Sequence, residues 1–590
     1  MKPKKYHTLR VFYETARIAP ARFISQYLFA SVDGVLFGYS AIQLQVVFDG
    51  VIGVSANSVK VSEVVAAILV FLAMKAGSEI ASVISNYLGN QYYQISTEYF
   101  LEQINRKLSK VPPLAFESSE SLDAFQRAHE GALVARGLLN IIMDIVTFYA
   151  PYFFIISNYL FKQKPDLVLI MVLFFLPVFL TNRLKRTRHQ ELEKALASSE
   201  REKSTYFDYL AKYEYLRETR TLRATSFFKD LYDRTRSIHN QQLVMVREKD
   251  LKTDSISKLT VTLGYMLSLA LLIGSTVRGQ ISVGTFAALF AALDGLFLFT
   301  EELFVRRLGS YAENFPKLKN LIWLLNLEET HEDEDGPFGF TGIHLKNVCF
   351  RYPDSEVDSL NGINLTISQG ETIALVGSNG SGKTTLAKII LGLYRPSSGE
   401  VFFENVNGAR TRQELFRGNA TAVFQKFNKY KVGLEDNVRI SEIEKNYTEQ
   451  EIRGVLDAVG FDLEASELAD GLQTICSKEF GGTDFSGGEW QKIAISRAIF
   501  RERDFVVLDE PTAAIDPIQE HKLYALFADL SKNKTAIIVT HRLASISFCS
   551  RIIVMSEGRI VGDGTHEDLL RRSSAYRELW NAGSGHSLLA

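Results

Sequence analysis

The sequence predicts two domains of different fold class, an α-helical membrane domain of six long helices followed by an α/β domain of the P-loop class. Three observations lead to this prediction. The long apolar runs all fall before about residue 305 of the 590 residues. A glycine-rich motif follows a short apolar strand at residues 372–376, as it does in phosphate-binding loops. Between the two parts lies an acidic, glycine-containing stretch, residues 328–341, which is typical of a linker.

Six apolar segments in the first part of the chain predict membrane helices, because most of them can cross a hydrocarbon core of about 30 Å. They are residues 23–48, 64–88, 138–161, 166–184, 259–277 and 283–304. Several of them are interrupted by ionisable residues, namely Asp33, Asp49, Lys75, Glu79, Asp144 and Asp294. At membrane depth such residues face a bundle interior or water rather than lipid.

Basic residues set the orientation of these helices. They precede the first segment and follow the fourth, at Lys2, Lys4, Lys5, Arg10, Arg17 and Arg22 and at Arg183, Lys185, Arg186 and Arg188. Both termini are therefore expected in the cytoplasm. The outer links at 55–60, 162–165 and 278–282 are short, whereas the inner segments 89–136 and 185–256 are long, charged and helical in pattern. We expect the membrane helices to continue into the cytoplasm and form two inner hairpins there.

Composition excludes some classes of function. The net charge is −2 with 46% hydrophobic residues, so nucleic acid is not an expected partner. Cys349, Cys476 and Cys549 show no CxxC spacing and are interpreted as packing residues. The first apolar run starts after about twenty mostly polar residues and is broken by Asp33, which is not the pattern of a cleavable signal. The amphipathic residues 7–18 are expected to lie along the inner membrane surface.

The glycine-rich motif fits GxxxxGK[ST] and predicts a cradle for the phosphates of ATP. Its residues are Gly377, Ser378, Asn379, Gly380, Ser381, Gly382, Lys383, Thr384 and Thr385. Backbone N–H groups of such a loop surround the phosphates, Lys383 adds a positive charge, and the Thr384 hydroxyl can ligate Mg²⁺. The plain alternative is a glycine-rich turn without a ligand.

A second motif lies at the end of the apolar segment 505–508, which predicts a strand buried on both faces. Asp509 and Glu510 follow it. Asp509 suits Mg²⁺, and Glu510 would orient or deprotonate the attacking water. Taken alone, the pair could also be a strand end that faces solvent.

The third motif is Phe485-Ser486-Gly487-Gly488-Glu489, directly before a helical stretch at 490–500. It resembles the signature sequence of ATP-binding cassette (ABC) proteins, in which Leu-Ser-Gly-Gly-Gln is usual. Phe485 and Glu489 depart from that pattern, but the Ser-Gly-Gly core is intact. A hydroxyl and backbone donors at a helix N-terminus can hold a γ-phosphate, and the resemblance implies this role for residues 486–489.

Other residues match the same family one by one. Tyr352 resembles the aromatic residue on which adenine stacks, or is an ordinary strand-end tyrosine. Gln425 resembles the glutamine that contacts the metal and the catalytic site and links them to the membrane domain. Asp516 resembles the loop residue that crosses the dimer interface, and His541 resembles the histidine that senses the γ-phosphate. Glu479 either contacts the membrane domain or lies on a solvated surface.

The resemblance covers nearly the whole chain and implies the fold of an ABC exporter half transporter. Its ATPase domain would contain a RecA-like core, an antiparallel β subdomain and a helical subdomain carrying the signature. The chain has one cradle and one signature, and each ATP in this family is sandwiched between the two motifs of different cassettes. A homodimer with two ATP sites, driven by alternating access, is therefore implied. The hairpin tips at 117–125 and 205–211 would rest on the cassettes.

The expected domain boundaries are 1–327 for the membrane domain, 328–341 for the linker, 342–582 for the ATPase domain and 583–590 for a mobile tail. The implied location is a bacterial plasma membrane, with lipid around a multi-pass chain.

The substrate class follows from a looser resemblance to exporters of lantibiotic or nisin type, carried by residues 197–202, 215–220, 424–430, 435–438 and 487–494. It implies export of a ribosomally made, modified peptide. About twenty residues without cysteine precede the first apolar run, so leader-peptidase activity is not expected. The alternatives are a lipid or drug exporter, a non-transporting ABC ATPase and an importer.

Four acidic residues could lie along a path for a cationic peptide. Asp294 and Glu301 are seven residues apart and share a helical face, and Asp33 and Asp144 could complete the cavity. The alternative is that helices extending beyond the bilayer place some of these carboxylates in solvent.

Overall fold

The computed structural model describes residues 6–329, 339–412, 418–464, 468, 470–510, 517–532, 534–540, 546 and 549–584. The chain forms two compact units. The first, the membrane unit, contains Met1–Ser109 and Asp123–Leu327. The second, the ATPase unit, contains Glu328–Ala590 together with the short segment Lys110–Leu122.

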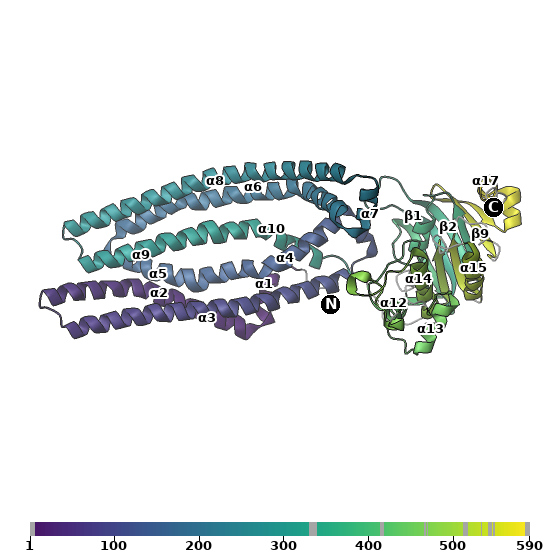
Figure 1. Cartoon of the computed structure of the whole chain (residues 1–590). Coiled ribbons are helices and arrows are strands. Elements are labelled where there is room, and N and C mark those ends of the chain that lie inside the picture. Colours follow the sequence, from purple (N-terminus) through teal and green to yellow (C-terminus); the bar gives the residue numbers. More distant parts are fainter. Residues whose placement is uncertain are drawn as a thin grey trace. The chain divides into compact units, whose positions relative to one another are not determined.

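The membrane unit consists of long helices that run side by side (Figure 1). Its helices are α1 Thr8–Ile18, α2 Pro20–Ser55, α3 Val61–Leu108, α4 Ser119–Asp144, α5 Ala150–Gln163, α6 Pro165–Ala211, α7 Tyr213–Thr221, α8 Thr225–Val277, α9 Val283–Glu301 and α10 Leu308–Leu325. Two π-helical turns, η2 Ile145–Tyr149 and η3 Glu302–Arg307, join α4 to α5 and α9 to α10.

Five stretches among the described residues are long and apolar enough to cross a membrane: Pro20–Ser55, Val61–Leu108, Arg127–Gln163, Thr225–Val277 and Val283–Glu301. They contain five of the six predicted segments, the last of which runs on into η3. The remaining segment, residues 166–184, lies within α6. A span needs only about 20 residues, whereas α3, α6 and α8 have 48, 47 and 53. The prediction that helices continue beyond the apolar segments is thus confirmed.

Several of the interrupting charges have partners inside the membrane unit. Asp144 accepts hydrogen bonds from Arg307 and from the Asn140 amide, the latter at 2.9 Å. Asp33 accepts one from the Ser78 hydroxyl. These carboxylates therefore join helices, which is the usual condition for a charge at membrane depth.

Asp49 has a different role, at the N-terminus of α9. Ser282 caps this helix by accepting the N–H of Thr285 at 2.9 Å. The Asp49 carboxylate accepts the N–H of Gly284, another residue of the first turn, at 3.0 Å. A Cβ at Gly284 would lie 2.3 Å from the Asp49 oxygen, so glycine permits this approach. The carboxylate at a helix N-terminus is also favoured by the helix dipole.

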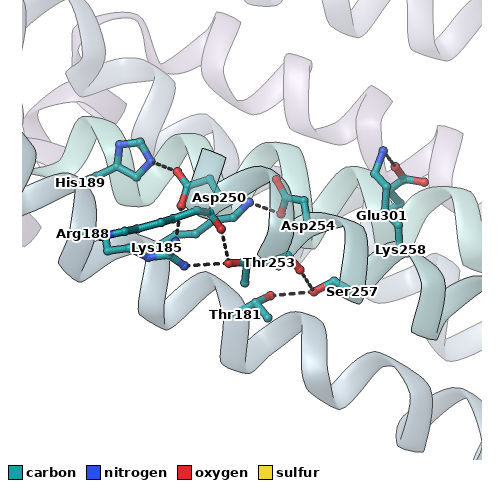
Figure 2. Close-up of polar contacts among 11 residues, drawn as sticks. Thr181, Lys185, Arg188, His189, Asp250, Thr253, Asp254, Ser257, Lys258 and Glu301 are labelled. Atoms are coloured by element: carbon teal, nitrogen blue, oxygen red, sulfur yellow. Dashed lines mark hydrogen bonds and ion pairs between the residues drawn. The ribbon is translucent and has the colours of Figure 1, made fainter. Parts of the chain in front are cut away.

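Charged and hydroxyl side chains join α6 to α8, and one ion pair joins α8 to α9 (Figure 2). Asp250 accepts a hydrogen bond from His189 and forms an ion pair with Arg188, the residue next to it in α6. The contacts are Thr181–Ser257 at 3.1 Å, Lys185–Asp254, Arg188–Asp250 at 3.0 Å, His189–Asp250 at 2.8 Å and Lys258–Glu301 at 3.1 Å. All but the last of these contacts link α6 and α8, two helices of 47 and 53 residues.

The amphipathic segment 7–18 forms α1, which buries Val11, Phe12 and Thr15 and exposes Leu9 and Tyr13. Its burial against the bundle supports the predicted helix. The Tyr92 hydroxyl on α3 donates to the Thr15 carbonyl, so α1 is fastened to α3.

The ATPase unit contains two sheets. A four-stranded antiparallel sheet has the order β2-β1-β4-β5, and a six-stranded sheet has the order β10-β9-β3-β8-β7-β6. In the larger sheet, β6, β7, β8, β3 and β9 are parallel and β10 is antiparallel to β9. The strands are β1 Phe340–Phe350, β2 Leu360–Ser368, β3 Thr372–Gly377, β4 Ser398–Asn405, β5 Arg410–Arg412, β6 Ala420–Val423, β7 Phe505–Asp509, β8 Thr535–Val539, β9 Arg551–Ser556 and β10 Arg559–Gly564.

Every residue of β7 and β8 is buried, as the apolar runs predict for central parallel strands. The helices of this unit are α11 Lys383–Ile390, α12 Leu434–Arg439, α13 Glu449–Ala458, α14 Gly487–Arg501, α15 Pro517–Ser531, α16 His566–Arg572 and α17 Ser574–Ser584. The larger sheet, the antiparallel sheet and the α12–α14 region correspond to the three subdomains that were expected.

The cysteines are free thiols. Burial raises the pKa of Cys476 to about 11 and that of Cys549 to about 12. Both side chains therefore remain protonated and apolar at neutral pH, as expected of packing residues.

Candidate nucleotide-binding site

The glycine-rich loop connects β3 to α11, and its glycines adopt conformations that other residues rarely take. Gly377, Gly380 and Gly382 have φ of 154°, 78° and 100°. A Cβ at Gly377 would lie 2.2 Å from the Met555 carbonyl oxygen. Only glycine fits there, and the resulting turn directs the loop toward the N-terminus of α11, where backbone N–H groups and the helix dipole favour an anion.

Lys383 is the first residue of α11 and is buried. Its ammonium group donates to the carbonyl oxygens of Gly377 at 3.0 Å and Ser378 at 2.9 Å, and lies 3.4 Å from the Ser381 hydroxyl. Burial lowers the pKa of Lys383, although the nearby Glu510 and Asp509 oppose this. The cation is thus held inside the loop that would surround the phosphates.

Asp509 is the last residue of β7 and lies next to the start of α11. The Thr384 hydroxyl donates to its carboxylate at 3.2 Å. Burial raises the pKa of Asp509 from its usual 3.8, while the Thr384 hydrogen bond opposes the rise. A hydroxyl and a carboxylate side by side are the oxygen donors that Mg²⁺ prefers, so these two residues fit the predicted metal.

Glu510 follows directly and has a left-handed backbone, with φ of 48°. This conformation is strained for a residue with a Cβ and often marks functional sites. The Glu510 N–H donates to the Val539 carbonyl at 2.9 Å, which fixes the turn. The Gln425 amide, just beyond β6, donates to the Glu510 carboxylate at 2.6 Å. Gln425 and Glu510, 85 residues apart, are therefore brought together.

Tyr352 lies beside the cradle. Its hydroxyl is 3.1 Å from that of Thr385. Its ring packs edge-on against Phe350 and Tyr394, with centroids 5.0 and 5.9 Å away. The predicted adenine platform is thus anchored next to the phosphate loop.

The signature residues begin α14. The Ser486 hydroxyl accepts the N–H of Glu489 at 3.3 Å, and the Glu489 carboxylate accepts the N–H of Ser486 at 2.7 Å. These reciprocal bonds form a capping box. Phe485 packs edge-on against Phe461 and Trp490, with centroids 5.6 and 6.0 Å away. The two departures from the usual signature therefore have local structural roles.

Other sequence-predicted residues take varied positions. Gly487 and Gly488 form the first turn of α14. Glu479 is exposed and ion-paired with Lys431, in keeping with a solvated surface. Asp516 and His541 lie outside the described residues.

Sequence reasoning missed an arginine that organises the segment after Gln425. Arg497 on α14 donates to the Asn428 carbonyl at 2.9 Å, and to the carbonyl and side chain of Asn437 at 2.8 and 2.7 Å. Asn437 is fully buried and donates to three carbonyls of residues 430–433. The available signal was an arginine in the middle of the apolar stretch at residues 493–500 of α14.

The segment 110–122 carries a second missed contact within the ATPase unit. Glu117 accepts a hydrogen bond from the Tyr394 hydroxyl and lies 3.5 Å from the Lys388 ammonium group. Burial and the bond to Glu117 raise the pKa of Tyr394. Leu114 packs against the apolar core of the unit. The predicted tip, residues 117–125, thus makes its contact at its first residue.

Residues 360–513 match the family model described as ABC transporter. The chain is 29% identical over 528 residues to the subtilin transport ATP-binding protein of Bacillus subtilis, covering 88% of this chain and 85% of that protein. It is 29% identical over 395 residues to the nisin transport ATP-binding protein of Lactococcus lactis subsp. lactis, covering 65% of each. An ATP-dependent lipid A-core flippase of Haemophilus ducreyi is 34% identical over 239 residues, covering 40% of each.

Among solved structures, a bacterial Atm1-family ABC exporter with ATP bound superposes with a TM-score of 0.78 at 19% identity, covering 96% of this chain and 98% of that one. At this identity the likeness concerns the fold. It extends over both units of the chain.

Proposed function

Because the chain contains the ATPase domain of an ABC transporter and has the half-transporter exporter fold, we propose that it exports a ribosomally synthesised, modified peptide such as a lantibiotic. Two copies would act together, in a bacterial plasma membrane with both termini in the cytoplasm. The chain is an ATP-hydrolysing transporter. We propose in addition that its substrate is a peptide, that it acts as a dimer and that both of its termini are cytoplasmic.

Each ATP would lie between two copies of the chain. The cradle at residues 377–385 would hold the phosphates from one side. The capped N-terminus of α14 would close the site from the second copy, because the first-turn N–H groups of Gly487 and Gly488 have no acceptor within the helix. One cradle and one such helix per chain support two equivalent sites in a homodimer.

The residues around the cradle have distinct roles in this proposal. The ammonium group of Lys383 would shift from the loop carbonyls to the phosphate oxygens. Thr384 and Asp509 would hold Mg²⁺, with Gln425 at its edge, and the ion would neutralise charge on the phosphates. Glu510, oriented by Gln425, would position the attacking water and accept its proton. The contact that carries the proposal is the Gln425–Glu510 hydrogen bond.

ATP binding would favour a state in which the two cassettes are together and the membrane helices open outward. Hydrolysis would restore the state in which the two cassettes are apart. To shift the population almost completely from the open to the closed dimer, ATP must bind the closed dimer more tightly than the open one by several kcal/mol.

The peptide substrate is supported by the subtilin and nisin transport relatives and by the acidic residues of the membrane unit. Asp294 on α9 is exposed, and it would favour a cationic peptide. By contrast, Glu301 is paired with Lys258 at 3.1 Å and Asp144 with Arg307.

A second candidate is a lipid exporter of the same fold, which is favoured by the lipid A-core flippase relatives. Purified protein in inside-out vesicles distinguishes the two. ATP-dependent uptake of a modified cationic peptide, absent in Glu510→Gln, supports peptide export. ATP-dependent lipid translocation without peptide uptake would instead show that the chain is a lipid exporter.

A further inference from the structure

The chain passes between its two units at three points: Ser109–Lys110, Leu122–Asp123 and Leu327–Glu328. The first follows the end of α3 and the third follows the end of α10. Lys107, in the last turn of α3, donates a hydrogen bond from its ammonium group to the carbonyl oxygen of Leu327. Lys107 and Leu327 are 220 residues apart in sequence, and their hydrogen bond joins two of the three crossing points inside the membrane unit.

This bond is buried and charged. Lys107 is only 7% exposed, and a buried ammonium group is costly unless it is hydrogen-bonded. Its acceptor lies just beyond the C-terminus of α10, where carbonyl groups lack intrahelical partners and the helix dipole favours a cation. A charged donor gives a stronger hydrogen bond than a neutral one, so the two crossing points are held firmly.

The neighbouring residue is held as well. Asn326 ends α10 and forms two hydrogen bonds with the backbone of Tyr6, accepting from its N–H at 2.6 Å and donating to its carbonyl at 2.8 Å. Tyr6 lies just before α1 and is covered by the Arg10 guanidinium, 4.0 Å from its ring centre. Residues 326–327 are thus fixed from two sides before the chain enters the linker.

In the ATPase unit, the segment that follows Lys107 contacts the end of the cradle helix. Lys388 lies in α11, which starts at Lys383, and Tyr394 lies shortly after it. Both contact Glu117. A shift of α11 on nucleotide binding would therefore pull on the segment 110–122, whose first residue lies three positions after Lys107.

We propose that Lys107 is a positioning residue for transport: it ties the start of the segment 110–122 to the start of the linker, so that both move together when the cradle binds ATP. This inference rests on the proposed export function. Without the tie, the ATPase domain would move the linker and the segment separately, and hydrolysis would be poorly coupled to the membrane helices.

The first test is Lys107→Met in the full-length protein, reconstituted in vesicles. ATP binding and basal hydrolysis should stay within about twofold of wild type, while peptide transported per ATP hydrolysed should fall by about fivefold or more. Lys107→Arg, which keeps a cationic donor, should retain most of the coupling. Arg106→Met is the matched control, because Arg106 pairs with Glu102 in an exposed position, and it should leave coupling unchanged.

A second test covers the case in which Lys107→Met does not fold. Lys107→Cys and Leu327→Cys are combined in a background without the three native cysteines and joined by a short bifunctional thiol reagent. Transport should survive this cross-link, because the two positions move as one. Loss of transport with hydrolysis intact, or unchanged coupling in Lys107→Met, would overturn the inference. Wild-type protein that hydrolyses ATP but exports no peptide would instead overturn the proposed function.

Discussion

The side-chain amide of Gln425 donates a hydrogen bond to the carboxylate of Glu510, with 2.6 Å between Nε2 and Oε2. The two residues follow neighbouring parallel strands, β6 and β7. Glu510 keeps its position through a left-handed backbone, which costs free energy and persists only where the surroundings impose it. The carboxylate is thus oriented in advance, as expected for a group that must place a water molecule.

Glu510→Gln should therefore keep ATP binding but lower hydrolysis by roughly 10² or more, because the general base is lost while the shape is retained. Phosphate release and nucleotide binding by purified protein measure the two effects separately. Turnover within about twofold of wild type would show that Glu510 is not the base.

Asp509→Asn should stabilise the nucleotide-free protein at about pH 7. Because burial raises the pKa of Asp509, the folded state binds a proton more tightly than the unfolded state. The favourable contribution of this carboxyl is present below its usual pKa of 3.8 and is lost as the pH rises through the raised pKa. Above that range the ionised group destabilises the fold.

Thermal unfolding at several pH values tests whether the ionised Asp509 carboxylate destabilises the nucleotide-free fold. The midpoint of Asp509→Asn should exceed that of wild type at neutral pH, and the difference should shrink in acid. In the variant, Mg²⁺ should add little to the stabilisation by ATP, because a predicted ligand is lost. A variant less stable than wild type without nucleotide would contradict the account.

Glu489→Gln should keep the cap of α14, because an amide oxygen can also accept the Ser486 N–H. It removes a negative charge from a helix N-terminus that is proposed to bind phosphate. The KM for ATP should fall by about two- to fivefold, the size of a charge effect at such a site. Glu489→Ala, which loses the reciprocal bond, should lower unfolding stability by about 1 kcal/mol. An unchanged KM in the glutamine variant would argue that this carboxylate lies away from the phosphate.

Asp294→Asn should impair export of a cationic peptide and leave basal ATP hydrolysis intact, because the exposed carboxylate of α9 is proposed to face the substrate path. Asp144→Asn is the contrasting variant: it removes one of the two carboxylates that pair with Arg307 and should mainly lower the thermal midpoint in detergent. Normal peptide export by Asp294→Asn would remove this residue from the path.

Much of this architecture could be predicted from local patterns. The apolar segments marked the long helices, and the cradle and the strand before Asp509 were recognisable because glycine, lysine and buried strands occur at fixed spacing. Glu510 was placed by the same buried strand, which it follows directly after Asp509. Gln425 required the family resemblance, since it has no distinctive local sequence.

Contacts between distant residues could not be predicted in the same way. Asp144 was a candidate for the substrate path, but it is neutralised by Arg307, 163 residues away. Asp49 was an interruption of an apolar segment, and the structure makes it an acceptor at the N-terminus of α9. Lys107 binds a backbone carbonyl, which carries no side-chain signature at all.

The buried thiol of Cys476 has a practical consequence for watching this molecule at work. It lies 3% exposed in the helical subdomain, close to Asn437, and its pKa is raised to about 11. Maleimides react with thiolates that they can reach, so alkylation of this position at neutral pH should require the subdomain to open. The alkylation rate of Cys476 therefore measures how often the subdomain opens locally. Comparing this rate with and without nucleotide would show how far ATP suppresses the opening.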